Sequence, residues 1–379
     1  MPEPQCSAAD HAHMAEALRL AERGLFTTMP NPRVGCVIVR EGQVVGRGWH
    51  ERAGEAHAEI HALREAADLA RGATVYVSLE PCSHYGRTPP CAEALIAAGA
   101  RRVVVAMTDP NPLVAGRGIA RLRAAGIAVS VGLLREEALA LNVGFVARMR
   151  RGRPWLRLKI AASLDGRTAL ANGESQWITG AEARADGHRW RARACAILTG
   201  IGTARRDDPR LTVRGVAVER KPPLKVIVDP RLELSPTARL FDGGPVLVVS
   251  AREDAERALP LQEKGAEWIA LPEADGTRVD LAALLRELGR REINEVHGEA
   301  GAGLNGAFLA SGLADELLLY LAPCLLGSGQ GMFRLPELDH LDARHPLAFR
   351  EVTQIGADLR ILASCPADGD FMNDDPATG

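Results

Sequence analysis

The sequence has few aromatic residues, no surplus of charge of either sign and no long apolar run. Trp, Tyr and Phe make up 4% of its 379 residues, and 46 Lys and Arg against 48 Asp and Glu leave a net charge of −2. This balance gives no electrostatic reason to expect a nucleic-acid partner. No apolar segment approaches the ~20 residues that cross a bilayer, which argues against a membrane-spanning helix or a membrane partner.

Cysteine is also scarce, and its pattern is typical of a reducing compartment. The seven cysteines are an odd number and widely scattered, unlike a disulfide framework. The opening residues, MPEPQCSAAD, have no basic start and no apolar stretch, so we expect no signal peptide. These features together predict a cytoplasmic protein.

The residues that carry chemistry are concentrated between His57 and Cys91. One imidazole (His57) and two thiolates (Cys82 and Cys91) are the protein ligands of an open tetrahedral zinc site, with water in the fourth position. Zinc lowers the pKa of its bound water towards ~7, and Glu59 could pass the released proton to leaving ammonia. The pattern predicts hydrolytic deamination of an aminopyrimidine-like ring by zinc hydroxide.

Other interpretations of this stretch are less favoured. A structural zinc site would want a fourth protein ligand. His61, one helical turn after His57, is a rival ligand, but we interpret it as a polar residue on a helix face. Zinc deaminases of nucleosides and nucleobases carry His-x-Glu followed by Pro-Cys-x-x-Cys. Here eight residues, not two, separate the two cysteines.

The length and the pattern of elements predict two domains. In the first half, strands expected at 34–39, 74–78, 102–106 and 127–131 alternate with helices expected at 10–23, 57–70, 91–98, 118–125 and 135–148. This alternation favours a three-layer α/β domain with a mostly parallel sheet. The basic segment 148–154 is interpreted as the joint, which gives domains at 1–152 and 153–365 and a disordered acidic tail at 366–379.

The second half restarts the alternation and contains one nucleotide-binding pattern. The segment from Gly301 to Gly306 has the form G-x-G-x-x-G, follows an expected strand and opens a helix expected at 307–311. Such glycines let backbone amides approach a pyrophosphate at a helix N-terminus. The next strand ends in Ala322-Pro323 instead of an acid, so an NAD-type Rossmann domain is not supported. Simple packing of helix on strand stays an alternative role for these glycines.

Several longer motifs resemble a known family. Segments 30–35, 57–62, 79–91 and 109–118 are similar to the deaminase half of the bifunctional deaminase–reductase family of riboflavin biosynthesis, including the long thiol spacing. Segments 159–167, 173–179, 198–203, 207–212 and 298–301 resemble its reductase half. The resemblance implies a cytidine-deaminase-like domain followed by a dihydrofolate-reductase-like domain. It also implies deamination of a diaminopyrimidine ribosylamine phosphate, then reduction of its ribosyl group to ribityl by NADPH.

The resemblance assigns roles to individual residues. It implies Zn²⁺ on His57, Cys82 and Cys91, with Glu59 as the catalytic proton shuttle. The substrate contacts that it implies are Asn31, His50, His84 and Arg87 in the first half, and Lys159, Ser175, Arg191, Leu211, Arg214 and Glu299 in the second. The NADPH contacts that it implies are Ala161, Trp177, Thr203, Asp207, Gly301, Ala302, Gly303, Leu304, Asn305 and Gly306.

The expected partner is therefore a small phosphorylated aminopyrimidine, and the family also implies a homo-oligomer. Gly180 and Ala204 depart from the bulkier residues common in the family, close to the expected cofactor contacts. The main alternative function is a nucleic-acid or nucleoside base deaminase with an accessory nucleotide-binding domain. The long thiol spacing and the absence of net positive charge argue against it. A non-catalytic zinc module fused to a nucleotide sensor is the remaining alternative.

Overall fold

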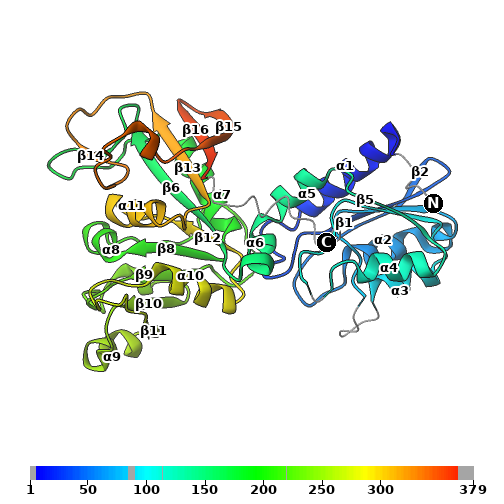
Figure 1. The fold of residues 1–379 in the computed structure, drawn as a ribbon, viewed down its shortest axis with the longest axis horizontal. Helices are drawn as coiled ribbons and strands as arrows, with labels where there is room; N and C mark the ends of the chain where they lie inside the picture. The colour runs from blue at the N-terminus through cyan, green and yellow to red at the C-terminus, as the bar shows by residue number, and fades with distance from the viewer. Residues whose placement is uncertain (1–5, 84–89, 113, 219, 366–379) are drawn as a thin grey trace. The chain divides into compact units, whose positions relative to one another are not determined.

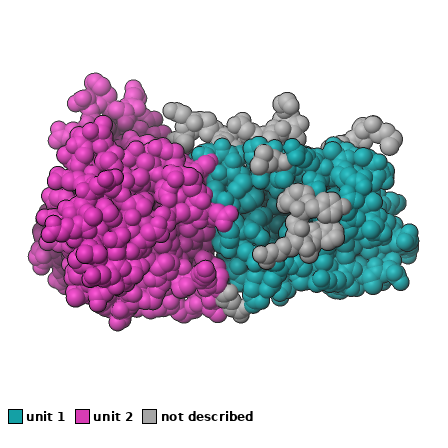
Figure 2. Space-filling model, turned by 90° about the horizontal axis from the view of Figure 1, so that it is seen from below, with its two compact units in different colours: residues 1–151, 370–379 teal, residues 152–369 magenta. Residues whose placement is uncertain are grey.

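The computed structural model describes residues 6–83, 90–112, 114–218 and 220–365 (Figure 1). The chain forms two compact units that divide between Arg151 and Gly152 (Figure 2). The expected substrate residues His84 and Arg87 and the predicted tail 366–379 lie outside the described residues. Within the described ranges, no helix is both long enough and apolar enough to cross a membrane.

The first unit is built on a five-stranded sheet of order β2-β1-β3-β4-β5 within the described residues. Its strands are β1 (Gly35–Arg40), β2 (Gln43–Trp49), β3 (Thr74–Val77), β4 (Arg102–Val105) and β5 (Ala128–Val131). The pairs β3–β4 and β4–β5 are parallel, whereas β1 is antiparallel to both β2 and β3. Strand β1 alone therefore runs against the other four strands, and the predicted mostly parallel sheet is interrupted at this one strand.

Helices cover both faces of this sheet and make it a three-layer unit (Figure 1). They are α1 (Ala8–Glu22), α2 (Ala58–Ala66), α3 (Cys91–Ala97), α4 (Arg117–Ala124), α5 (Arg135–Leu141) and α6 (Val143–Arg151). Alternate strand residues point to opposite faces. Ile38 and Val103 accordingly pack on the side of α2, α3 and α4, while Val37 and Val104 pack on the side of α1 and α5.

The helix predicted at 135–148 is two helices, with Asn142 between them. The Asn142 side chain accepts a hydrogen bond from the Arg33 backbone N–H at 2.8 Å and donates one to the Arg33 carbonyl at 2.9 Å. A tertiary contact with a distant segment therefore accompanies the break. Helix α6 then continues through Arg151, so the segment interpreted as a joint is largely helical.

The second unit contains a nine-stranded sheet of order β11-β10-β9-β8-β12-β6-β13-β16-β15 within the described residues. The first seven strands in this order run parallel, and β16 and β15 are antiparallel additions. The strands are β6 (Trp155–Ser163), β8 (Ala196–Gly200), β9 (Leu224–Val228), β10 (Val246–Ser250), β11 (Ala266–Ala270), β12 (Glu295–Gly298), β13 (Glu316–Ala322), β15 (Ala348–Ile355) and β16 (Asp358–Ser364). A small separate sheet pairs β7 (Arg167–Ala169) with β14 (Gln330–Gly331).

The helices of this unit again lie on two faces. They are α7 (Ala181–Arg193), α8 (Ile201–Asp207), α9 (Ala255–Glu263), α10 (Leu281–Arg290) and α11 (Ala302–Ala310). Leu284 of α10 and Phe308 of α11 share a core with Leu158 of β6, whereas α8 and α9 pack on the opposite face. Helix α11 begins five residues earlier than predicted, so Gly303 and Gly306 lie within its first turns and Gly301 is its N-cap residue. Helix α8 and the β15–β16 hairpin were not predicted.

Candidate active sites in the two units

The first site is a cluster of one histidine and two cysteines. Cys82 Sγ lies 3.6 Å and Cys91 Sγ lies 3.3 Å from His57 Nδ1, and the three ligand atoms lie within 4.8 Å of one another. Zinc bonds of about 2.3 Å to sulfur and about 2.05 Å to nitrogen place tetrahedral ligands about 3.6 Å apart. The donor set and spacing therefore fit a zinc ion. His61, the rival ligand, is not in this cluster of described residues.

Local structure positions these three ligands. His57 is the N-cap residue of α2, and Cys91 is the first residue of α3. The backbone N–H of Cys91 donates to Cys82 Sγ at 3.3 Å. Hydrogen bonding from the Cys91 thiol, together with His57, lowers the pKa of Cys82 to about 4. Partial positive charge at the N-terminus of α3 also favours thiolate at this position.

Glu59 lies in the first turn of α2, beside the cluster, with only 3% of its surface exposed. Burial, which penalises the charged form, raises the pKa of Glu59 to about 7, and the nearby His57 partly opposes that shift. A carboxyl group with a pKa near neutrality can both accept and release a proton. This environment suits the proton-shuttle role that the sequence predicts for Glu59.

Asn31 and His50 lie together next to this cluster. The rings of His50 and His57 meet edge to face with centroids 5.4 Å apart. His50 Nδ1 donates to the Ala56 carbonyl at 3.1 Å, which leaves Nε2 to accept from the Asn31 side-chain amide at 3.1 Å. Burial lowers the pKa of His50 and so favours its neutral form. Two of the four expected substrate contacts are therefore grouped beside His57, with His50 against its ring and Asn31 bonded to His50.

Glu80 is a structural support of this site that the sequence analysis missed. Its carboxylate accepts four backbone N–H groups, from Asp109, Gly116, Gly118 and Ile119, at 2.8–3.2 Å. It thereby fixes the loop before α4 against the segment that carries Cys82, two residues further on. The sequence shows an acidic residue in the segment Glu-Pro-Cys, but it does not show that this residue is buried or which four N–H groups it binds.

The second site is a cavity of about 520 Å³ in the second unit, within the size range of ligand pockets. Its walls come from β6, the segment 175–179, α8 and the N-terminus of α11. The expected residues that line it are Lys159, Ala161, Ser175, Trp177, Thr203, Asp207, Glu299, Gly301, Ala302, Gly303 and Leu304. Tertiary structure thus brings together expected residues from four separate sequence segments.

A buried charge cluster lies at one end of this cavity. Arg191 holds the Glu299 carboxylate through two hydrogen bonds, and His297 Nε2 lies 3.3 Å from Glu299 Oε1. Burial alone would raise the pKa of Glu299, but Arg191 and His297 hold it well below its ordinary value. Burial also lowers the pKa of Lys159 nearby. The cluster presents an ionised carboxylate and a lysine to whatever occupies the cavity.

The glycine pattern divides between two roles. Around Gly303 an added methyl group would meet nothing within 4 Å, whereas at Gly306 it would lie 2.0 Å from the Arg334 carbonyl oxygen. Gly306 therefore serves the packing of α11 on the segment at Arg334, the alternative that the sequence left open. Asn305 is buried and donates to the Ala300 carbonyl. Neither Asn305 nor Gly306 is among the described residues lining the cavity.

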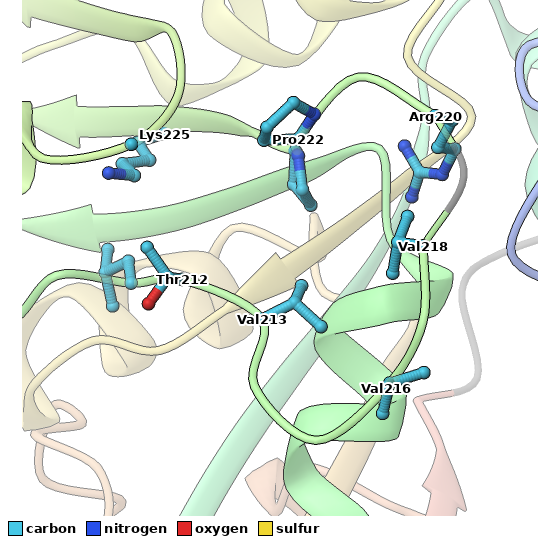
Figure 3. Close-up of a pocket in the computed structure, with 10 residues that line it drawn as sticks. Thr212, Val213, Val216, Val218, Arg220, Pro222 and Lys225 are labelled. Atoms are coloured by element: carbon cyan, nitrogen blue, oxygen red, sulfur yellow. The ribbon is translucent and has the colours of Figure 1, made fainter.

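Three expected substrate contacts lie beside the cavity instead of lining it. Arg191 donates to the Thr212 carbonyl, and the Arg214 backbone N–H donates to His188 Nδ1. Leu211 lines a separate cavity of about 260 Å³ under the loop 211–223. Figure 3 shows this cavity, with Lys225 of β9 at one end and Arg220 at the other.

This smaller cavity is below the usual size of a ligand pocket. Half of its lining residues are valine or proline. The Lys225 ammonium donates to the carbonyls of Leu240 and Asp242 at 2.7 and 2.6 Å. Lys225 therefore serves the local structure, and the larger cavity is the better candidate site.

Comparison with known proteins adds two family matches, one in each unit. The family described as the cytidine and deoxycytidylate deaminase zinc-binding region matches residues 7–107, and the RibD C-terminal domain matches residues 154–361. The riboflavin biosynthesis protein RibD of Escherichia coli K12 is 49% identical over 363 residues, covering 92% of this chain and 98% of that protein. The corresponding protein of Haemophilus influenzae is 45% identical over 94% of this chain and 97% of its own length.

Solved structures agree with these matches. Acinetobacter baumannii RibD (form 1) superposes with a TM-score of 0.85 at 44% identity, covering 94% of this chain and 99% of that chain. A diaminohydroxyphosphoribosylaminopyrimidine deaminase/5-amino-6-(5-phosphoribosylamino)uracil reductase of Thermotoga maritima superposes with a TM-score of 0.84 at 32% identity, with the same coverage.

Proposed function

Because the chain belongs to the RibD family of riboflavin biosynthesis, it is a bifunctional deaminase and reductase, and we propose how its residues divide the two reactions. The first unit, residues 1–151, deaminates the aminopyrimidine ring of a ribosylamine phosphate. The second, residues 152–365, reduces the ribosyl group of the product to ribityl. The observation that carries this proposal is the cluster of His57, Cys82 and Cys91, whose ligand atoms lie within 4.8 Å of one another beside the buried Glu59.

In the deaminase unit, His57, Cys82 and Cys91 would hold the zinc ion. When bound, zinc supplies a water molecule activated for attack at neutral pH. Glu59 takes a proton from the attacking water and delivers it to the amino group that leaves as ammonia. Asn31 and His50 orient the pyrimidine through the amide and imidazole groups that already hydrogen-bond to each other.

In the reductase unit, the cavity would hold NADPH across α8 and the N-terminus of α11. When bound, NADPH supplies the hydride. Lys159 and Glu299 face the ribose as it opens, and Arg191 keeps the Glu299 carboxylate ionised and oriented. Ser175 and Arg214 bind the phosphate and hydroxyl groups of the substrate. Hydrogen bonds to a charged phosphate are stronger than those between neutral groups.

The partner, compartment and assembly follow from the same proposal. The substrate is a free phosphorylated aminopyrimidine, not a base within nucleic acid, and the enzyme works in the cytoplasm as a homo-oligomer. The β15–β16 hairpin is an observation in favour of an oligomer. Strand β15 is the edge of its sheet within the described residues, and it exposes Phe349 and Val352. Edge strands with exposed apolar residues are normally covered.

An assay of purified zinc-replete protein tests the proposed function. The diaminopyrimidine ribosylamine phosphate is supplied with and without NADPH, while ammonia release and NADPH absorbance are followed. We expect ammonia without NADPH, then NADPH consumption when the cofactor is added. Ammonia release without NADPH consumption would contradict the reductase assignment. The absence of both signals would contradict the proposed substrate. Salt-dependent binding of RNA with deamination of its bases would favour the nucleic-acid alternative.

A further inference from the structure

Helix α8 presents two adjacent and opposite charges to the wall of the larger cavity. Arg206 and Asp207 both line it. Burial raises the pKa of Asp207, and the neighbouring Arg206 charge acts in the opposite direction. In dinucleotide sites an acid commonly binds the ribose hydroxyl of NAD, whereas a nearby arginine accommodates the 2′-phosphate of NADP. Asp207 alone would repel that phosphate, so a site for NADPH needs a cation beside it.

Arg206 differs from other arginines of this part of the unit in its partner. Arg205 and Arg231 pair with Glu233 at 3.2 and 3.1 Å, and each lies away from the cavity wall. The hydrogen bond of Arg206 goes from Nη1 to the neutral amide oxygen of Gln330, at 3.1 Å. Its guanidinium charge is thus retained at the cavity, with further N–H groups to offer.

The position of Arg206 relative to the rest of the site is also suitable. Residues three apart on a helix lie on one face, so Arg206 shares the face of Thr203. A methyl group at Gly301 would lie 3.6 Å from Thr203 Oγ1, which places this face next to the N-terminus of α11. A pyrophosphate at α11 would therefore leave its adenosine ribose close to Thr203, Arg206 and Asp207.

The remaining cations of the cavity are placed for other tasks. Arg184 stacks over Trp177 at 4.6 Å and donates to the Thr179 carbonyl at 2.6 Å. Lys159 lies with the Glu299 cluster, and its pKa responds to Glu299 and Arg191. Arg334 adjoins α11, where its backbone N–H donates to the Ala302 carbonyl at 2.9 Å. Arg206 is the cation beside the acid.

We propose that Arg206 recognises the 2′-phosphate of NADPH and sets the cofactor preference of the reductase. This inference rests on the proposed placement of NADPH in the cavity. The 2′-phosphate is the difference between NADPH and NADH, so the loss of Arg206 weakens the binding of NADPH and leaves the binding of NADH unchanged. A residue that contacted the pyrophosphate would weaken both.

The test compares Arg206→Gln with the wild-type full-length enzyme, using calorimetric binding of NADP⁺ and NAD⁺ and reductase kinetics with NADPH and NADH. We expect the Kd for NADP⁺ and the KM for NADPH to rise about 10- to 100-fold, the range of one hydrogen bond to a charged group. We expect the values for NAD⁺ and NADH to change less than twofold. Arg205→Gln, one residue earlier and paired with Glu233, should leave both cofactors unchanged.

Two results would overturn the inference: an equal loss for both cofactors, or no loss for either, in a variant whose deaminase activity and melting temperature are normal. Arg206→Glu makes the test sharper, because it should repel NADP⁺ more strongly than Arg206→Gln does. Failure of the wild-type enzyme to bind NADP⁺ would instead remove the proposed reductase function. The two failures are therefore distinguishable.

Discussion

At the scale of single residues, burial decides what each carboxyl group can do. Glu59 is buried next to metal-ligand residues, and the pKa of its carboxyl group is raised to about 7. Glu299 is also buried, but Arg191 and His297 hold its pKa well below the ordinary value. One acid is thus suited to moving a proton and the other to remaining charged, although each is a glutamate two residues after a histidine in the sequence.

Glu59→Gln should abolish deamination while zinc remains bound. The amide keeps the size of the side chain but cannot accept the proton, and general acid–base catalysis typically contributes about 10²- to 10⁴-fold. Ammonia release gives the activity, and elemental analysis gives the zinc content. Reduction of the deaminated substrate should be unchanged. Glu55→Gln, an exposed neighbour, serves as the control. Normal deamination by Glu59→Gln would contradict the mechanism.

Glu299→Gln should lose the reductase activity, and this loss should be larger than the loss of folding stability explains. It removes the charge that Arg191 holds at the cavity. Glu295→Gln breaks a comparable buried pair with Arg157, whose atoms lie 3.1 Å apart and whose residues do not line the cavity. Breaking a buried pair costs about 3–5 kcal/mol, so both variants should unfold at lower urea concentration.

NADPH consumption below the unfolding transition distinguishes the two variants. Glu295→Gln should retain its kcat, while Glu299→Gln should lose at least about 100-fold, the lower range for one catalytic group. Equal losses in the two variants would mean that Glu299 acts only through stability.

At the scale of elements, connections between loops and helices position the site. The carboxylate of Glu80 gathers the loop before α4, and Gly118 of α4 lies against Pro81. A methyl group at Gly118 would be 2.0 Å from the Pro81 carbonyl oxygen. The metal ligand Cys82 is the next residue. The position of this ligand therefore depends on a helix about 35 residues away in sequence, through contacts that no local pattern shows.

Gly118→Ala should weaken zinc binding. The new methyl group displaces Pro81 and with it Cys82, and disturbance of groups that support metal ligands typically costs about 10- to 100-fold in metal affinity. Competition with a chelator measures the affinity. Ala124→Ser, at an exposed position of the same helix, should leave it unchanged. Zinc affinity of wild-type strength in Gly118→Ala would show that the segment 80–82 adapts freely.

Asp10→Asn should destabilise the first unit at neutral pH. Burial opposes ionisation of Asp10, but hydrogen bonds from Tyr76 and Ser7 and the charge of Arg102 lower its pKa from 3.8 to about 2. A carboxyl group with a lowered pKa stabilises the folded state above pH 4 and loses that contribution as pH falls towards 2. The expected loss is about 2 kcal/mol at pH 7.

Urea unfolding at pH 7 and at pH 3 measures this effect as the difference in the free energy of unfolding between Asp10→Asn and wild type. This difference in free energy should be smaller at pH 3. Protonation of the proposed zinc ligands affects both proteins equally and so does not contribute to the difference. A difference that is the same at both pH values would show that packing, not charge, is what Asp10 contributes.

At the scale of the whole molecule, each unit has its own sheet and its own cores on both faces. Each candidate site is composed of residues from one unit. The two activities should therefore be lost separately, as the Glu59 and Glu299 variants are designed to show. The β15–β16 hairpin lies outside both sites and exposes apolar side chains.

Phe349→Glu combined with Val352→Asp should reduce the proposed oligomer to smaller species. In the single chain these side chains are 71% and 55% exposed, and burying each in an interface would contribute about 1.5–3 kcal/mol. Light scattering after gel filtration measures the mass. Leu69→Glu, an exposed leucine of the first unit, is the matched control. An unchanged mass in the double variant would place the interface elsewhere.

The sequence alone predicts a ligand set and a proton shuttle, and it predicts most of the helices and strands that the structure contains. Those features rest on local spacing: His57 and Glu59 are separated by one residue, and strands such as β10 are continuous apolar runs. The resemblance to a family supplied the expected residues of the second site, because no local spacing joins the four separate segments that carry them.

Which of those residues meet depends on how the chain folds in three dimensions. The tertiary structure places Asn31 and His50 against the zinc ligands, assigns Gly306 to packing and Gly303 to open space, and puts Arg206 beside Asp207 on the cavity wall. It also breaks the helix at Asn142 and adds the antiparallel edge of the large sheet. The physical reason is that burial, pKa and close approach depend on neighbours distant in sequence, which composition and periodicity do not specify.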